Sequence, residues 1–149
     1  MDVAILWLVN ERGEILLSQR ATHVDSDAGV WGPSVSGKVE EGEEPEEAAV
    51  RETQEELGID PQILSPIHLH DEVHNHSDGR LRKFSIFYSK INKNTSETMN
   101  LDPNEVASTK WISLDDFQML FSEDPASIII SSATKLWEDI FTNLRVAVS

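Results

Sequence analysis

Apolar and polar positions along the chain change period from segment to segment, and the period separates strands from helices. Segments of extended character lie at 3–10, 14–20, 30–37, 62–74, 81–91 and 105–114, and the third of them is a short stretch that carries a Pro and two Gly. The first two flank Glu11-Arg12-Gly13 and the fourth and fifth flank 76–79, so each pair predicts a β-hairpin. The polar stretches 21–29 and 92–104 are expected to be loops.

Three segments carry helical signals. Pro45 suits a first turn and Gly58 a left-handed residue after the last turn, which predicts a helix over 45–57 with Ala48, Ala49 and Leu57 on its buried side. Ser113 can cap a short helix over 114–121. A final helix is expected from Pro125, with an apolar stripe that suits core packing or a dimer surface. The stripe consists of Ile129, Ala133, Leu136, Ile140 and Leu144.

Strands mixed with three helices predict an α/β fold, an α/β/α sandwich with a mixed sheet. The 149 residues suit a single domain over 1–149, and a hydrophobic content of 39% is enough for a packed core. There is no cysteine, which excludes disulfides, thiolate zinc sites and cysteine catalysis. The apolar run at Val3–Val9 is too short for a secretory signal or a membrane span, so we expect a cytoplasmic protein with no membrane partner.

The formal net charge is −15. A phosphate backbone would be repelled by such a chain, which argues against a nucleic-acid polymer as partner. A small phosphorylated substrate that arrives with its cation remains compatible with this charge. The chain is expected to be a monomer or a homodimer.

The acidic segment 37–59 reads GKVEEGEEPEEAAVRETQEELGI. On a helix, Glu52, Glu55 and Glu56 project within an arc of roughly 100°. Carboxylates that close repel one another, and a hard divalent cation such as Mg²⁺ relieves the repulsion while it is shared with substrate phosphates. The alternative is a solvated acidic helix face.

This segment resembles the Nudix box, Gly-x5-Glu-x7-Arg-Glu-U-x-Glu-Glu-x-Gly-U, in which U is a bulky aliphatic residue. All seven fixed positions match, from Gly37 to Gly58, and the second U is Ile59. Thr53 stands at the first U and departs from the pattern, and its hydroxyl must find a partner or lie at the edge of the core. The Nudix fold is itself an α/β/α sandwich, so pattern and resemblance agree.

The resemblance implies a site for Mg²⁺, with Mn²⁺ as a possible substitute. Its expected ligands are Gly37 through its carbonyl, Glu52, Glu55, Glu56 and Glu105. The catalytic candidates among them are Glu52, Glu55 and Glu105, and Glu105 serves either as a ligand or as a base. Its alternative is a solvated loop glutamate.

Four basic or acidic residues are expected to assist. Arg51 and Glu43 would support the ligands by charge-assisted hydrogen bonds, although Arg51 also suits an ordinary i, i+4 pair with Glu55. The resemblance places Arg20, in LLSQR, against a phosphate. Lys38 is equally suited to a phosphate contact or to a plain surface position.

The segment Trp31–Lys38 lacks the Pro-Gly-Gly of typical Nudix nucleotide hydrolases and is similar to dihydroneopterin triphosphate pyrophosphohydrolases. The expected reaction is attack of water within a triphosphate, giving a monophosphate and pyrophosphate. Isopentenyl diphosphate isomerases share a similar Trp-x-x-Ser-Val segment but rely on a catalytic cysteine. A non-catalytic sensor of nucleotides or sugar diphosphates is the remaining alternative.

Two further groups of side chains are ambiguous. Four histidines lie between His68 and His76. His68 and His70 share one face of the predicted strand, as His74 and His76 could, and this spacing can bind zinc; surface or pocket-wall positions are the alternative. The aromatic residues Trp31, Phe84, Phe87 and Tyr88 suit either stacking on a base or pterin ring or core packing.

Overall fold

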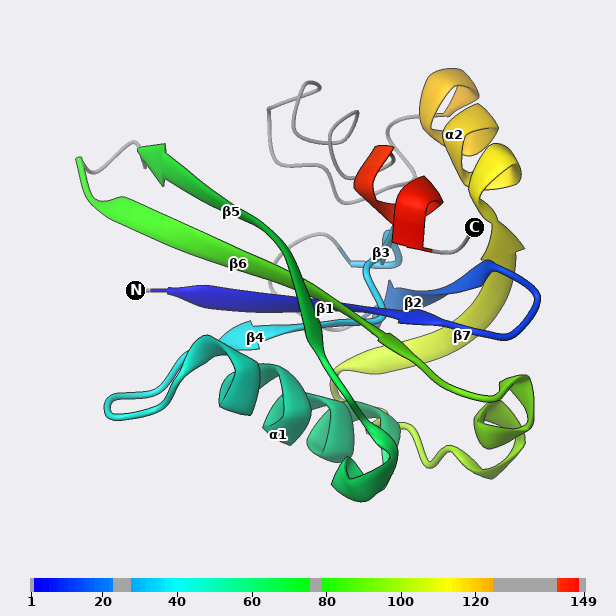
Figure 1. Cartoon of the computed structure of the whole chain (residues 1–149), viewed down its shortest axis with the longest axis horizontal. Coiled ribbons are helices and arrows are strands. Elements are labelled where there is room, and N and C mark those ends of the chain that lie inside the picture. The colour runs from blue at the N-terminus through cyan, green and yellow to red at the C-terminus, as the bar shows by residue number, and fades with distance from the viewer. Residues whose placement is uncertain (1, 23–27, 76–78, 125–141, 148–149) are drawn as a thin grey trace.

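A seven-stranded mixed sheet forms the centre of the protein, and Figure 1 shows helices on both sides of it. The computed structural model describes residues 2–22, 28–75, 79–124 and 142–147. The strands are β1 (Val3–Val9), β2 (Glu14–Arg20), β3 (Trp31–Gly32), β4 (Val35–Lys38), β5 (Ile67–Asn75), β6 (Leu81–Lys90) and β7 (Val106–Ser113). The helices are α1 (Pro45–Leu57), α2 (Leu114–Glu123) and the short 3₁₀ helices η1 (Pro61–Ile63) and η2 (Lys93–Thr98).

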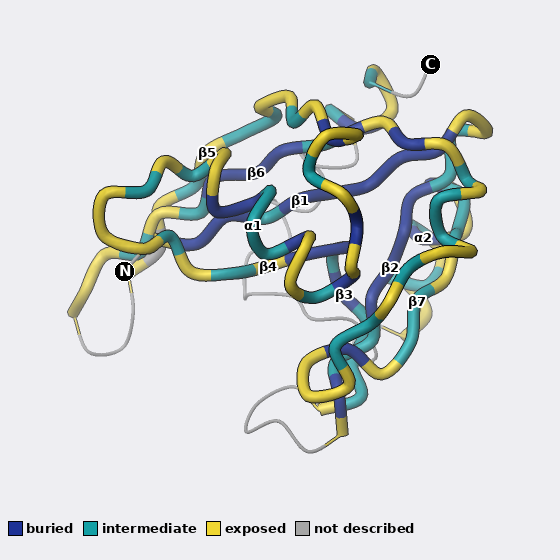
Figure 2. Tube along the Cα trace, turned by 90° about the horizontal axis from the view of Figure 1, so that it is seen from below, coloured by how far each residue is buried: buried dark blue, intermediate teal, exposed yellow. Residues whose placement is uncertain are grey.

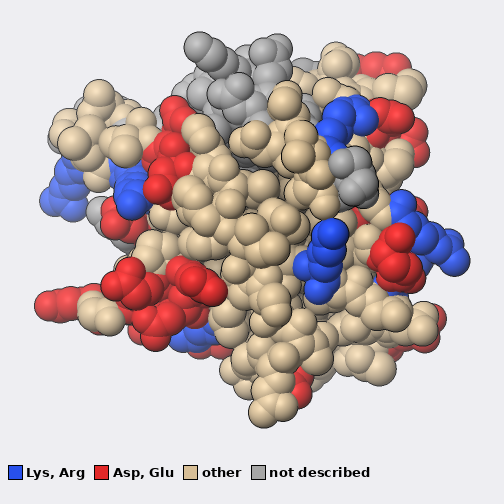
Figure 3. All heavy atoms as spheres, in the orientation of Figure 1, with Lys and Arg blue, Asp and Glu red and all other residues tan. Residues whose placement is uncertain are grey.

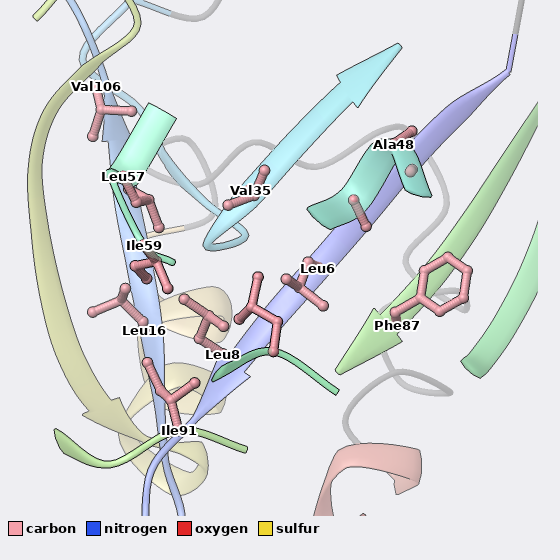
Figure 4. Close-up of a cluster of buried hydrophobic side chains, with 13 residues drawn as sticks. Leu6, Leu8, Leu16, Val35, Ala48, Leu57, Ile59, Phe87, Ile91 and Val106 are labelled. Carbon is pink, nitrogen blue, oxygen red and sulfur yellow. The ribbon is translucent and has the colours of Figure 1, made fainter. Parts of the chain in front are cut away.

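Alternation along β1 divides the buried residues between two cores. Leu6 and Leu8 pack on the α1 side, where Figure 4 shows them with Leu16, Leu57 and Phe87. Trp7 and Val9 point to the other side and pack with Phe117 of α2 and with Leu144. Successive strand residues face opposite ways, so a strand covered on both sides is apolar throughout, and Figure 2 shows β1 and β2 buried. The expected α/β/α sandwich with a mixed sheet is confirmed.

The sheet is mixed because β1 runs parallel to β6, from Val3 opposite Phe84 to Val9 opposite Lys90, while the other pairs are antiparallel. The predicted first hairpin is present but narrow. β1 and β2 pair next to the turn, at Val9 and Ile15. Farther from the turn, β1 pairs with β4, and β2 pairs with β7 along its length. β4 therefore enters the sheet beside β1, where a simple hairpin would have placed β2.

Ser34 bridges β1 and β2 by hydrogen bonds at the place where the two strands separate. Its buried hydroxyl accepts the Leu8 N–H at 2.9 Å and donates to the Leu16 carbonyl at 2.6 Å. The Ser18 hydroxyl donates to the Ser34 carbonyl at 2.7 Å. One side chain thus satisfies backbone groups of both strands, which would otherwise be buried without partners. The arrangement directs the chain along β4 toward α1.

Helix α1 has the predicted bounds, and the sequence explains both ends. Glu44 and Glu47 form a reciprocal capping box at the start, and Pro45 occupies the first turn. Gly58 ends the helix in the left-handed conformation at φ 68°. Thr53 is fully buried, and its hydroxyl donates to the Ala49 carbonyl at 2.6 Å. The hydroxyl in place of an aliphatic group is therefore satisfied within the helix.

The predicted start of the fourth strand was wrong. The strand expected over 62–74 begins at Ile67, because Asp60 caps η1 and two prolines interrupt the segment before it. The loop expected over 92–104 contains η2, which the Trp111 indole holds by donating to the Ser96 hydroxyl at 3.0 Å. Of the final predicted helix, residues 142–147 are helical and Leu144 is buried. The rest of its apolar stripe lies outside the described residues.

Candidate active site

A hollow lies where the end of β4 faces the second half of α1. Its lining consists of Ser36, Gly37, Lys38, Glu52, Glu55, Glu56, Asp102 and Glu105. Six of these residues are candidates that the sequence had singled out. They come from β4, from α1 and from the loop before β7, so three distant segments meet here. Glu43, Arg51 and Arg20 lie outside this lining.

Gly37 lets the Glu52 carboxyl group lie against the backbone of β4. A Cβ atom at position 37 would be 2.3 Å from both Cγ and Cδ of Glu52, closer than any real contact. The helix and the strand can bring the Glu52 side chain and the Gly37 main chain together only because residue 37 has no side chain. This explains in physical terms why the box begins with a glycine.

Arg51 does not line the hollow itself but pairs with carboxylates in it and beside it. It pairs with Glu43 through Nε at 2.9 Å and Nη2 at 3.2 Å, and Nη2 also donates to the Lys38 carbonyl at 3.0 Å. Its Nη1 atom donates to Glu52 at 3.0 Å and to Glu55 at 3.1 Å. The expected support and the i, i+4 pair are thus both present. These contacts raise the pKa of Arg51 and lower the pKa of Glu43, so both remain charged.

Glu56 is the most perturbed carboxyl group of the hollow. Burial, together with the neighbouring carboxylates of Glu52 and Glu105, raises its pKa to about 8, while Arg20 acts in the opposite direction. Burial also raises the pKa of Glu52, against the stabilising hydrogen bond from Arg51. Near neutral pH, Glu56 therefore carries a proton that a bound cation would displace.

The raised pKa of Glu56 predicts a pH-dependent stability. In an unfolded chain this group ionises near 4.5, whereas in the folded protein it stays protonated to about 8. The folded state therefore binds more protons in this window, so its stability advantage is complete below the lower value and is lost as pH rises through the upper one. We expect the unfolding free energy of the wild type, relative to Glu56→Gln, to fall between about pH 5 and 8.5 in EDTA. Denaturant titrations measure this difference, and a flat difference would contradict the prediction.

The donor set fits a hard divalent cation. It consists of carboxylates and a backbone carbonyl, which are the oxygen ligands that Mg²⁺ and Mn²⁺ prefer. Within the described ranges, no three His, Asp or Glu side chains are gathered as a ready-made metal site. The carboxylates of Glu52 and Glu55 are instead engaged by Arg51, and a cation would compete with its guanidinium for them.

A second, smaller pocket adjoins the hollow and shares Ser36, Glu56 and Glu105 with it. Arg20 lies in this pocket, at the end of β2, so a cationic side chain stands on the far side of Glu56 and Glu105. Lys38 is exposed at the end of β4. The two basic candidates therefore lie at different borders of one acidic site.

Asp102 and Ser36 line the hollow but were missed from the sequence. Asp102 stands in Leu-Asp-Pro-Asn, a composition typical of turns, and the signal was interpreted as part of a polar loop. The packing of this loop against the end of α1 is what brings Asp102 to the hollow. Ser36 lies within β4, and nothing in its sequence context marks it.

The prediction that His68 and His70 share one face was wrong. A β-bulge places His68 opposite Phe87 and His70 opposite Ile86, and those two residues belong to opposite cores. Each histidine pairs with its own carboxylate at 2.8 Å, His68 with Asp71 and His70 with Glu72. The side chain of His74 and the whole of His76 lie outside the described residues.

Aromatic candidates divide in a similar way. Phe87 is buried in the α1-side core, and Trp31 and Tyr88 pack against the other core. The Lys110 ammonium lies 4.3 Å from the centre of the Trp31 ring, a cation–π contact. Core packing therefore accounts for these three residues.

The surface charge is unevenly distributed. Figure 3 shows Asp and Glu atoms gathered at the lower left, where Figure 1 places the loop before α1 and the start of that helix. The exposed acidic residues there are Glu40, Glu41, Glu44, Glu46 and Glu47. In the described part of the chain, no helix has the length and apolar character needed to cross a membrane.

Known proteins resemble this chain in sequence and in fold. Isopentenyl-diphosphate Delta-isomerase of Salmonella heidelberg (strain SL476) is 39% identical over 64 residues, which cover 43% of this chain and 35% of that protein. The matched part thus spans about a third of the length of this curated relative.

Two solved structures share the fold over nearly the whole chain. DR0079 from Deinococcus radiodurans has a TM-score of 0.74 at 19% identity and matches 99% of this chain and 83% of its own. The E. coli dihydroneopterin triphosphate pyrophosphohydrolase has a TM-score of 0.68 at 20% identity, over 99% of this chain and 94% of its own.

The family model of the NUDIX domain matches residues 1–131, most of the chain and all of the acidic segment that forms the hollow. The match agrees with the fold, with the seven fixed positions of the box from Gly37 to Gly58 and with the meeting of its glutamates at one place. The chain belongs to the NUDIX family.

Proposed function

We propose that the protein hydrolyses a diphosphate linkage in a nucleoside triphosphate-like small molecule, releasing a monophosphate and pyrophosphate. The observation that carries the proposal is the meeting of Glu52, Glu55, Glu56 and Glu105 in one hollow, with Arg20 and Lys38 at its borders. Such a hollow is too acidic to accept a polyphosphate alone, so the substrate would enter together with divalent cations. The protein would work as one domain over residues 1–149.

The residues of the hollow divide the task among them. Glu52, Glu55, Glu56 and the Gly37 carbonyl would hold Mg²⁺ or Mn²⁺. When bound, the cation offsets the negative charge of the phosphates and lowers the pKa of water. Arg51 and Glu43 keep the ligand carboxylates in place through the contacts described above. Arg20 and Lys38 would bind phosphate oxygens and orient the chain of phosphates.

Glu105 is suited to accept a proton from the attacking water. It is exposed to the hollow, and its carboxylate is close enough to Glu56 to raise the pKa of that residue. We expect Glu105→Gln to reduce kcat at least about tenfold with little change in KM, because an amide cannot take up the proton. Steady-state kinetics with the best substrate measure both constants. Wild-type turnover in this variant would remove Glu105 from the mechanism.

The substrate class is tested by release of phosphate and pyrophosphate with Mg²⁺. The panel should contain common and oxidised nucleoside triphosphates, dihydroneopterin triphosphate, dinucleoside polyphosphates and sugar nucleotides. Dihydroneopterin triphosphate is included in the panel because Trp31–Lys38 is similar to the corresponding segment of its hydrolases. Tight binding without turnover across the whole panel would contradict hydrolysis and favour the sensor alternative.

Isomerisation of isopentenyl diphosphate is a second candidate, favoured by the 39% identity to the Salmonella isomerase over 64 residues. Members of that group rely on a catalytic cysteine, and this chain contains none. The matched stretch covers 43% of this chain and 35% of the isomerase, so it says nothing of more than half of either protein. Adding isopentenyl diphosphate to the panel, with product analysis for dimethylallyl diphosphate, separates the two reactions.

A further inference from the structure

A single turn connects the end of α1 with Glu105. The N–H group of Asp102 donates to the Glu56 carbonyl at 2.9 Å, and the Asp102 carbonyl accepts from the N–H groups of Glu105 at 3.0 Å and Val106 at 2.8 Å. One residue therefore stands between the main chain of Glu56 and that of Glu105. The last carbonyls of a helix lack partners within the helix, so this turn also satisfies one of them.

The side chain of Asp102 shapes this turn. Its Oδ1 atom accepts from the N–H group of Asn104 at 3.0 Å, which is an Asx turn. The hydrogen bond spans Pro103 and determines how the chain reaches Glu105. Any acceptor oxygen at the same place would make the bond, so the turn needs an oxygen at this position but no negative charge.

Contacts on both sides keep the turn in place. Asn100 donates its N–H to the Leu57 carbonyl at 3.0 Å, and a Cβ atom on Gly58 would lie 2.9 Å from the Asn100 carbonyl oxygen. The loop can therefore approach the helix only because residue 58 is glycine. On the other side, the Glu105 carbonyl accepts from Ala21, next to Arg20, at 3.0 Å. Glu105 is thus fixed relative to α1 and to the end of β2 at once.

We propose that Asp102 is a positioning residue that holds Glu105 over the hollow by means of its Asx turn, and that it acts through geometry and not through its charge. The inference rests on the function proposed for Glu105. A displacement of a proton acceptor by a fraction of the distance to its water is enough to slow proton transfer strongly.

The test compares Asp102→Ala with Asp102→Asn, each alone and combined with Glu105→Gln. We expect Asp102→Ala to lower kcat about tenfold while KM stays within about twofold. Asp102→Asn should stay close to the wild type, because its side-chain oxygen still accepts from Asn104. In the Glu105→Gln background, Asp102→Ala should cause no further loss, because it acts through the residue already removed.

Asp60→Ala is the matched control. Asp60 makes the same kind of turn, with Oδ1 accepting from the Gln62 N–H at 2.9 Å, but it does not line the hollow. We expect a similar loss of stability and an unchanged kcat. Equal loss of kcat in Asp102→Asn and Asp102→Ala would overturn the inference, since charge would then matter. So would an additive loss in the Glu105→Gln background, or the same fall in kcat for Asp60→Ala.

Crystal structures of the two variants give a readout that does not depend on activity. Asp102→Ala should displace the Glu105 main chain by about 1 Å or more, and Asp102→Asn should leave it in place. If the wild type hydrolyses nothing in the panel, the proposed function fails, and the inference is decided by these structures alone. An undisplaced Glu105 in Asp102→Ala would overturn it.

Discussion

Replacing Glu55 and Glu56 together with Gln is expected to abolish hydrolysis, with a fall in kcat/KM on the order of a thousandfold or more. Both residues line the hollow on adjacent positions of α1. Amides keep the size of the side chains but lose the anionic oxygens that hold a hard cation. Burial already favours the uncharged form of Glu56, so the fold should tolerate the change. Calorimetric titration with Mg²⁺ measures the loss of cation binding, and pyrophosphate release measures the loss of hydrolysis.

The matched control is Glu41→Gln with Glu46→Gln. Both of these residues are exposed near the start of α1, and the change replaces the same number of carboxyl groups by amides at some distance from the hollow. We expect near wild-type hydrolysis from this variant. Should the Glu55/Glu56 variant retain cation uptake and hydrolysis, or should the control lose as much, the assignment of the hollow as the metal site would be wrong.

Gly37→Ala is expected to lower kcat/KM about a hundredfold while the melting temperature changes little. The added Cβ would lie 2.3 Å from Cγ and Cδ of Glu52, so the Glu52 side chain must move. Because that side chain is flexible, its displacement relieves the clash without disturbing the sheet. The cost therefore falls on metal binding and not on folding. Mg²⁺ affinity and thermal unfolding, measured on the same preparation, separate the two effects.

A double variant shows whether Gly37 acts through Glu52. In a Glu52→Gln background, Gly37→Ala should cause little additional loss, because the ligand it displaces is already gone. A loss in that background as large as in the wild type would show that Gly37 has another role. A large fall in melting temperature with unchanged Mg²⁺ affinity would mean that the added methyl group disturbs folding and leaves the metal ligands in place.

Local signals were sufficient for α1, the helix that carries three of the glutamates of the hollow. The Pro45 and Gly58 signals gave the bounds of α1, because caps act on the backbone beside them. Helical spacing placed Glu52, Glu55 and Glu56 together, since 3.6 residues per turn is a property of the helix alone. The fixed spacing of the Gly, Glu and Arg residues also explains why the box indicates one family from the sequence alone.

Pairing between distant segments was not accessible in the same way. The first hairpin was predicted from its turn, but β4 took the place beside β1 that the hairpin would have filled. The His68–His70 pair was assigned to one face from the period of a regular strand, and a bulge moved them to opposite faces. Both outcomes depend on which strands pair and in which register, and this is determined by the whole sheet and not by one segment.

The sequence by itself determined the central helix, both of its ends and the spacing of its carboxylates. The tertiary structure alone decided that Asp102 would connect Glu56 with Glu105, and that Arg51 of α1 would donate to the Lys38 carbonyl at the end of β4. The helical period and the capping residues act over a few positions, so both can be recognised from the local sequence. The hollow is lined by residues of β4, α1 and the loop before β7 that lie up to 69 positions apart along the chain, from Ser36 to Glu105, and it exists only once the sheet has brought those segments together.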